Sequence, residues 1–214
     1  MEMNNVTYGN PTIEYKKFIT EPCLVGDLFE KLKQEGFPQN DSELTKEELN
    51  QIVDNLASIK QEENDSFLKR YKAYDRSLSQ VLISTFKQKN IDVEDLVHEI
   101  FGDIRGLIFK LKYYYQRPRP YQLAQYYKLA LFPFKSHSAD TPSYPSGHGV
   151  QSYVTLNVIG NKYPEHYSFC KELIDDVFFS REYLGIHYSS DNDFATTVGK
   201  EILKHKEFAK KYGI

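Results

Sequence analysis

The chain of 214 residues has two cysteines, two methionines and no tryptophan, and it lacks any long hydrophobic run. Cys23 and Cys170 are too few for a disulfide framework and too sparse for a zinc site. The densest apolar stretch, "LALFPF", is only six residues long and contains Pro133, whereas a membrane-spanning helix needs about 20 apolar residues. The composition therefore predicts neither a disulfide scaffold nor a transmembrane protein, and we expect a soluble one.

Signals for export and for β-structure are also missing. The first residues, "MEMNNVTYGN", have no basic n-region and no apolar h-region, so we expect no signal peptide and a cytoplasmic location. No segment shows convincing strand alternation, an internal repeat or low complexity.

The charge is small overall but unevenly distributed. The net charge of −3 by itself neither favours nor excludes nucleic acid, and we expect no nucleic-acid partner. Residues 1–65 hold 14 acidic and 6 basic residues, whereas residues 66–214 hold 16 acidic and 21 basic residues. The larger part therefore suits an anionic small molecule.

Apolar residues at helical spacing occupy most of the chain, so we predict an all-α fold, a compact bundle of six or more helices. Thr45 and Glu48 form a capping-box pattern, and Asp92 is a predicted N-cap. The further predicted helices cover residues 66–87, 93–115, 121–131, 146–162, 164–185 and 191–206, with a polar loop over 132–145. We predict an acidic N-terminal extension of unknown role over 1–60 and a helical domain with the functional motifs over 61–214.

Three clusters in the second half of the chain carry chemistry. They are "KLKYYYQRPRP" with Lys112 and Arg119, "PSGH" with Ser146, Gly147 and His148, and "SREYLGIHYSSD" with Arg181, His187 and Asp191. Each cluster alone also has a structural interpretation. Lys112 and Arg119 could be solvated helix ends, Arg181 could pair with Glu182 or Asp176, and PSGH could be a turn followed by a helix cap.

Together the clusters suit a bound phosphate monoester, which carries a charge of about −1.5 to −2 near pH 7. Three fixed cations can neutralise it, and a helix N-terminus at Ser146 and Gly147 can add neutral donors. The two histidines fit a nucleophile and an acid. Asp191 and His187 could each simply cap a helix, but Asp191 could also hold one nitrogen of His187 as N–H and leave the other free to attack.

The three clusters resemble the signature of the type 2 phosphatidic acid phosphatase (PAP2) superfamily, which includes bacterial class A acid phosphatases and vanadium haloperoxidases. That signature reads K-x6-RP, then PSGH, then SR-x5-H-x3-D, and every fixed position is filled in order. The resemblance covers about residues 105–205. Lys110 with Arg117 fits the first part as well as Lys112 with Arg119, which we prefer because the family's arginine is often the second of an RPRP pair.

The resemblance implies a role for each matching residue. His187 is the expected nucleophile, Asp191 its orienting partner, and His148 the general acid that later activates water. The expected phosphate cradle consists of Lys112, Arg119, Ser146, Gly147 and Arg181. The implied activity is metal-independent phosphomonoester hydrolysis through a phosphohistidine, with no cofactor and with vanadate as an inhibitor.

Two alternatives remain open at this point. A vanadium-dependent haloperoxidase would use the same cradle with vanadate as prosthetic group, and a non-enzymatic structural or assembly protein could retain the site. The expected partner is a small phosphomonoester, and a lipid phosphate headgroup is a second option. The sequence leaves the oligomeric state open, a homo-oligomer included.

Overall fold

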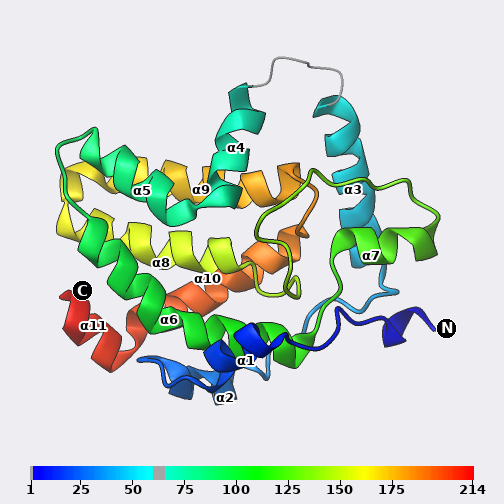
Figure 1. Cartoon of the computed structure of the whole chain (residues 1–214), viewed down its shortest axis with the longest axis horizontal. Helices are drawn as coiled ribbons and strands as arrows, with labels where there is room; N and C mark the ends of the chain where they lie inside the picture. Colours follow the sequence, from blue (N-terminus) through cyan, green and yellow to red (C-terminus); the bar gives the residue numbers. More distant parts are fainter. Residues whose placement is uncertain (1, 60–65) are drawn as a thin grey trace.

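A computed structural model describes residues 2–59 and 66–214, and every regular element in these ranges is helical (Figure 1). This confirms the predicted all-α fold. No helix in the described ranges has both the length and the hydropathy needed to cross a bilayer. The α-helices are α1 Ile13–Thr20, α2 Phe29–Leu32, α3 Glu43–Ile59, α4 Ser66–Arg76, α5 Leu78–Lys87, α6 Glu94–Tyr115, α7 Pro120–Ala124, α8 Gly147–Lys162, α9 Tyr167–Tyr183, α10 Ser189–Lys204 and α11 Lys206–Tyr212.

Helix α8 lies at the centre of the molecule, where it packs against α6, α9 and α10. Its apolar residues belong to two buried clusters, one shared with α6 and α10 and one shared with α5 and α9. The first cluster takes Val150 and Val154 from α8, and the second takes Leu156 and Ile159. A helix that is buried on several sides gives its N-terminus a fixed position, and PSGH lies at that N-terminus.

Helix α6 ends at Tyr115 as predicted, but it begins at Glu94 and its N-cap is Val93, not the predicted Asp92. The Asp92 carboxylate accepts a hydrogen bond from the Glu94 N–H at 3.1 Å and so satisfies one free donor of the first turn. The helix ends where Gln116 adopts a left-handed conformation (φ 49°), one residue before the RPRP segment. Prolines cannot continue a helix, so the two arginines of this segment leave the helix axis and turn into the protein.

The single helix predicted over 66–87 is wrong. The chain breaks at Ser77, which has an extended backbone (φ −162°, ψ 94°), and its hydroxyl accepts from the Gln80 N–H at 3.4 Å to start α5. The apolar spacing continues through the break, which is why periodicity did not reveal it. The break leaves Tyr74 and Asp75 buried in the last turn of α4.

The capping box predicted at Thr45 and Glu48 is also wrong. Helix α3 begins two residues earlier, and the Ser42 hydroxyl accepts from the Thr45 N–H at 3.2 Å. Thr45 instead donates to the Gln39 carbonyl at 2.8 Å. Glu48 is buried inside the helix and points toward α10, because its partners are there and not at the start of α3.

The helix predicted over 121–131 is shorter than expected. Helix α7 passes into a 3₁₀ turn over Gln125–Tyr127, and Lys128 then ends it in a left-handed conformation. Pro164 likewise opens a 3₁₀ turn that leads into α9 rather than α9 itself. The polar segment 132–145 is a loop, as predicted.

The described part of the predicted N-terminal extension packs onto the rest of the chain. Val25 and Leu32 are buried in the cluster around α6. Leu49 and Leu56 of α3 are buried in a third cluster with Tyr188, which immediately precedes α10. The predicted boundary at residues 60 and 61 lies outside the described residues.

Two glycines test the packing at the start of α8. A Cβ at Gly149 would lie 2.9 Å from the Ala195 Cβ of α10, whereas a Cβ at the exposed, helical Gly102 would meet no atom within 4 Å. We expect Gly149→Ala to lower the free energy of unfolding by about 1–3 kcal/mol, because the alanine Cβ cannot turn away. Gly102→Ala should raise it by about 0.5–1 kcal/mol. Urea unfolding of both variants measures the difference, and equal effects would contradict the close approach of α8 and α10.

Candidate active site

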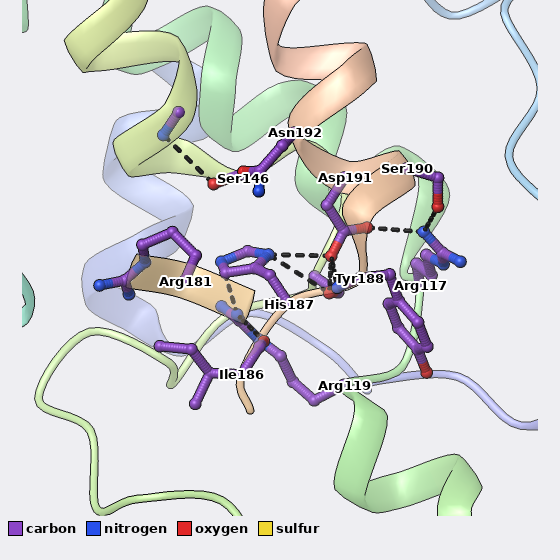
Figure 2. Close-up of polar contacts among 12 residues, drawn as sticks. Arg117, Arg119, Ser146, Arg181, Ile186, His187, Tyr188, Ser190, Asp191 and Asn192 are labelled. Carbon is purple, nitrogen blue, oxygen red and sulfur yellow. Dashed lines mark hydrogen bonds and ion pairs between the residues drawn. The ribbon is translucent and has the colours of Figure 1, made fainter. Parts of the chain in front are cut away.

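The predicted site residues converge from separate elements at the N-terminal end of α8. Figure 2 shows Arg119, Ser146, Arg181, His187 and Asp191. Lys112 lies in the last turn of α6, Arg119 immediately precedes α7, and Arg181 lies in the last turn of α9. The remaining residues are Ser146, Gly147 and His148 at the start of α8, His187 in the α9–α10 connection, and Asp191 in the first turn of α10.

His187 is held on both ring nitrogens. Its Nδ1 lies 2.9 Å from Asp191 Oδ2, and its Nε2 lies 2.8 Å from Arg119 Nη1. A guanidinium can only donate, so Nε2 must be the acceptor and Nδ1 must carry the proton. Burial lowers the pKa of His187 well below its ordinary value, and Arg119 lowers it further. The structure therefore favours a neutral imidazole whose lone pair is on Nε2.

Asp191 collects donors on both carboxylate oxygens. Besides His187 Nδ1, Oδ2 accepts from the Tyr188 N–H at 3.0 Å and from the Ser143 hydroxyl. Oδ1 accepts from Arg117 Nη1 at 2.7 Å. The contact with the Tyr188 N–H caps α10, so Asp191 serves both the helix and the histidine.

Arg119 is 1% exposed, and its guanidinium lies beside His187. Its Nε donates to the Thr141 carbonyl at 2.7 Å, and Nη1 donates to the Ile186 carbonyl at 2.8 Å as well as to His187. Burial lowers the pKa of Arg119, and the charge of Asp191 opposes this effect.

Lys112 is also buried, and its Nζ donates to the Pro142 carbonyl at 2.6 Å. Burial and the neighbouring Arg119 lower the pKa of Lys112 well below its ordinary value. Lys110 instead lies near Gly26 of the N-terminal segment, where a Cβ would be 3.8 Å from its Nζ. The structure therefore places Lys112 and Arg119 together, while Lys110 points elsewhere.

Arg181 pairs with neither Glu182 nor Asp176, so the alternative structural interpretation of this arginine is wrong. Its Nη2 donates to Asp75 Oδ1 at 3.0 Å and to the Ser138 hydroxyl at 2.7 Å, while Asp176 binds Arg70. The break in the chain at Ser77 is what places Asp75 here. Burial lowers the pKa of Arg181 to about 10 although Asp75 opposes it. Its Nε and Nη1 have no hydrogen-bond partner among the residues that the structure describes.

The start of α8 provides donors at the same place. The Ser146 hydroxyl accepts from the Gly149 N–H at 3.2 Å, as predicted for a helix cap, and the Ser146 N–H donates to the Asp191 carbonyl at 3.1 Å. Burial lowers the pKa of His148 well below its ordinary value, and Arg181 lowers it further. Gly147 lies against Lys112, since a Cβ at Gly147 would be 3.4 Å from its Cε.

A cavity of about 240 Å³ opens above this region. Lys112, Gly147 and His148 form part of its lining, and Tyr15 of α1 and Asp140 of the loop form part of its rim. The Tyr15 hydroxyl donates to Asp140 at 2.5 Å. His187, by contrast, is only 2% exposed.

The loop segment 138–143 covers the cations. Pro142 and Thr141 offer carbonyls to Lys112 and Arg119, and Ser138 accepts from Arg181. These contacts satisfy buried donors that an oxyanion could also satisfy.

Sequence reasoning missed Glu48, Asp75 and Ser143, and it recognised Arg117 only as an alternative to Arg119. Glu48 precedes its partner Arg117 by 69 residues in the sequence, and Asp75 precedes its partner Arg181 by 106 residues. No local sequence pattern predicts pairs that are so far apart in the chain. Across the described ranges, no group of three or more His, Cys, Asp or Glu side chains is arranged to hold a metal ion.

The Asp75–Arg181 pair predicts a pH-dependent stability. Burial alone would raise the pKa of Asp75, but Arg181, Ser138 and the His137 N–H outweigh it and the net pKa is lowered. A lowered folded pKa means that the stabilisation is present above pH about 4 and is lost as the pH falls toward the folded value. Asp75→Asn should therefore destabilise the chain by about 3–5 kcal/mol at pH 7 and by progressively less below pH about 4.

Urea titrations of wild type and variant at several pH values check this expectation, with the exposed Asp54→Asn as control. A difference between wild type and Asp75→Asn that does not change with pH would contradict it.

The comparisons with known proteins agree with this geometry. The model of the PAP2 superfamily matches residues 100–200. A solved structure of a transmembrane PAP2 type phosphatidylglycerolphosphate phosphatase from Bacillus subtilis superposes with a TM-score of 0.53 at 18% identity, covering 80% of this chain and 87% of that one. No curated protein matches the chain. The segment that matches the PAP2 superfamily model thus contains the three motifs in order, and the chain shares its helical fold with a PAP2 type phosphatase.

Proposed function

We propose that this chain hydrolyses phosphomonoesters without a metal, through a phosphohistidine on His187. The match to the PAP2 superfamily supports a phosphatase. The observation that carries the finer proposal is the buried series Asp191–His187–Arg119, in which Asp191 holds Nδ1 and leaves the Nε2 lone pair directed at an anion-binding arginine.

In the first step, a phosphoryl oxygen of the substrate replaces Nε2 of His187 as the acceptor of Arg119 Nη1, which frees the Nε2 lone pair. Nε2 then attacks phosphorus, and the bond from phosphorus to the ester oxygen breaks. His148 lies at the cavity side and donates its proton to the leaving alcohol. The substrate dianion brings a negative charge to His148, which opposes the lowering of its pKa by burial and by Arg181.

In the second step, His148 takes a proton from water, the water oxygen attacks phosphorus, and the P–N bond breaks. Inorganic phosphate leaves and His187 is again neutral. Asp191 stabilises the positive charge that develops on the ring while the P–N bond exists. Lys112, Arg119 and Arg181, together with donors at Ser146 and Gly147, stabilise the charge on the phosphoryl oxygens.

The same cradle fits an oxyanion of similar shape, because Arg181 Nε and Nη1 are buried donors without partners among the described residues. Vanadate should therefore compete with the substrate. The leaving group occupies the cavity beside Tyr15 and Asp140. The cavity suits the alcohol of a small phosphomonoester, and a lipid phosphate headgroup is the second substrate class to test.

We expect the chain to hydrolyse p-nitrophenyl phosphate after thorough chelation with EDTA and to incorporate an acid-labile, base-stable phosphoryl label on His187. The reason is that the three buried cations supply the charge that a divalent metal would supply elsewhere. Rapid-quench labelling with a radioactive ester measures the intermediate. His187→Ala should abolish the label, and His98→Gln at an exposed position should retain it.

Two outcomes would contradict the proposal and favour an alternative. Halide-dependent peroxide consumption by the vanadate-loaded chain, without ester hydrolysis, would indicate a haloperoxidase. Absence of both turnover and vanadate binding would indicate a non-enzymatic protein that retains the motif.

Activity should be highest on the acidic side of neutrality. The nucleophile must be neutral, and because the pKa of His187 is lowered, it stays neutral as the pH falls below about 6.5, the ordinary histidine value. His148 must be protonated in the complex, so rising pH removes activity. We expect kcat, which reports the ionisations of the enzyme–substrate complex, to remain high below pH about 6.5. A loss of kcat on acidification with a midpoint above that pH would contradict a neutral, buried His187.

A further inference from the structure

Arg117 is fully buried and joins two carboxylates that lie far apart in the chain, Glu48 and Asp191. Figure 2 shows its contacts with Asp191 and Ser190. Its Nη1 donates to Asp191 Oδ1 at 2.7 Å and to the Ser190 hydroxyl at 2.8 Å, and its Nη2 donates to Glu48 Oε2 at 3.1 Å. The guanidinium also lies over the Tyr188 ring, 3.9 Å from its centroid. A planar fork is suited to bridging two carboxylates in one fixed arrangement.

The second oxygen of Glu48 binds the start of α10. Oε1 accepts from the Ser190 N–H at 2.7 Å and from the Ser189 hydroxyl at 2.9 Å. A carboxylate at a helix N-terminus satisfies free N–H groups and is favoured by the helix dipole. Glu48 of α3 therefore anchors the turn of α10 that presents Asp191.

We propose that Arg117 and Glu48 are positioning residues that fix Asp191 and adjust the charge to which His187 is exposed, which makes α3 a working part of the active site. The expected effect of the two residues on kcat rests on the proposed function. Their expected effect on the pKa of the His187 ring does not. Neither residue reaches His187 or the cavity: Arg117 acts through Asp191, and Glu48 acts through Arg117 and α10.

The charges around His187 give the two residues opposite effects. Lys112 from α6, Arg119 from the segment before α7, Arg181 from α9 and His148 from α8 all disfavour a protonated ring. Asp191 from α10 favours it by direct contact. Arg117 compensates part of the Asp191 charge, and Glu48 compensates part of the Arg117 charge.

Removing the two charges should therefore move the titration of His187 in opposite directions. Glu48→Gln leaves Arg117 less compensated, so protonation of His187 becomes harder and its pKa falls. Arg117→Gln leaves Asp191 uncompensated by this arginine, so protonation becomes easier and the pKa rises. A purely structural role would loosen the same site in both variants and would not produce opposite signs.

The experiment is a pH titration of the full chain labelled with ¹⁵N-histidine, in which His187→Gln assigns the His187 ring signals. Wild type should show a neutral ring with the proton on Nδ1. Glu48→Gln and Arg117→Gln should shift the His187 titration in opposite directions, and the double variant should lie between them. Glu47→Gln is the matched control, because Glu47 is the exposed neighbour of Glu48 on the same helix. Shifts of equal sign, or shifts no larger than in the control, would overturn the proposal.

Kinetics supply a second readout. We expect Glu48→Gln and Arg117→Gln to lower kcat about ten-fold or more, with little change in KM because neither residue contacts the phosphate. Arg117→Lys should restore part of kcat, since it keeps the charge but loses the fork. If Arg117→Gln does not fold, Glu48→Gln alone decides through the sign of its shift. A wild type that titrates as expected but does not hydrolyse esters would refute the proposed function and leave the positioning role intact.

Discussion

The site depends on burying three cations close together. Lys112, Arg119 and Arg181 are each at most 4% exposed, and moving an isolated charge out of water costs several kcal/mol. Burial lowers the pKa of Lys112 and of Arg181, and the charge of Arg119 lowers both further. The surrounding structure makes the arrangement stable by supplying acceptors, and the residual positive potential is what makes it suited to a phosphate dianion.

Those acceptors come from segments that local sequence patterns do not connect with the motifs. Carbonyls of Thr141 and Pro142 accept from Arg119 and Lys112, and Asp75 accepts from Arg181. The same loop contributes Ser143 to Asp191. Loop 138–143 and the last turn of α4 therefore stabilise the buried cations by accepting their hydrogen bonds, in addition to enclosing the site.

Helices α1 and α3, in the region before residue 60, also contact the site or its supports. Leu49 and Leu56 pack α3 against the segment around Tyr188, and Glu48 joins the same helix to the start of α10 through a hydrogen-bonded carboxylate. Tyr15 of α1 reaches the rim of the cavity from the other side. By composition these residues resemble an acidic extension. In the structure they contact the start of α10, which carries Asp191, and they line the cavity.

The sequence by itself determined the all-α fold, the helices over α6 and α8, and the ordered motif, because each depends on local spacing, capping or residue type. It did not determine the break at Ser77, since apolar periodicity continues through it, nor the roles of Glu48 and Thr45, which match a capping pattern but have distant partners. Only the tertiary structure decided which arginine meets His187 and which meets Asp191. Arg117 and Arg119 are alike in sequence, and they differ because the chain after α6 turns one guanidinium toward Glu48 and the other toward Thr141.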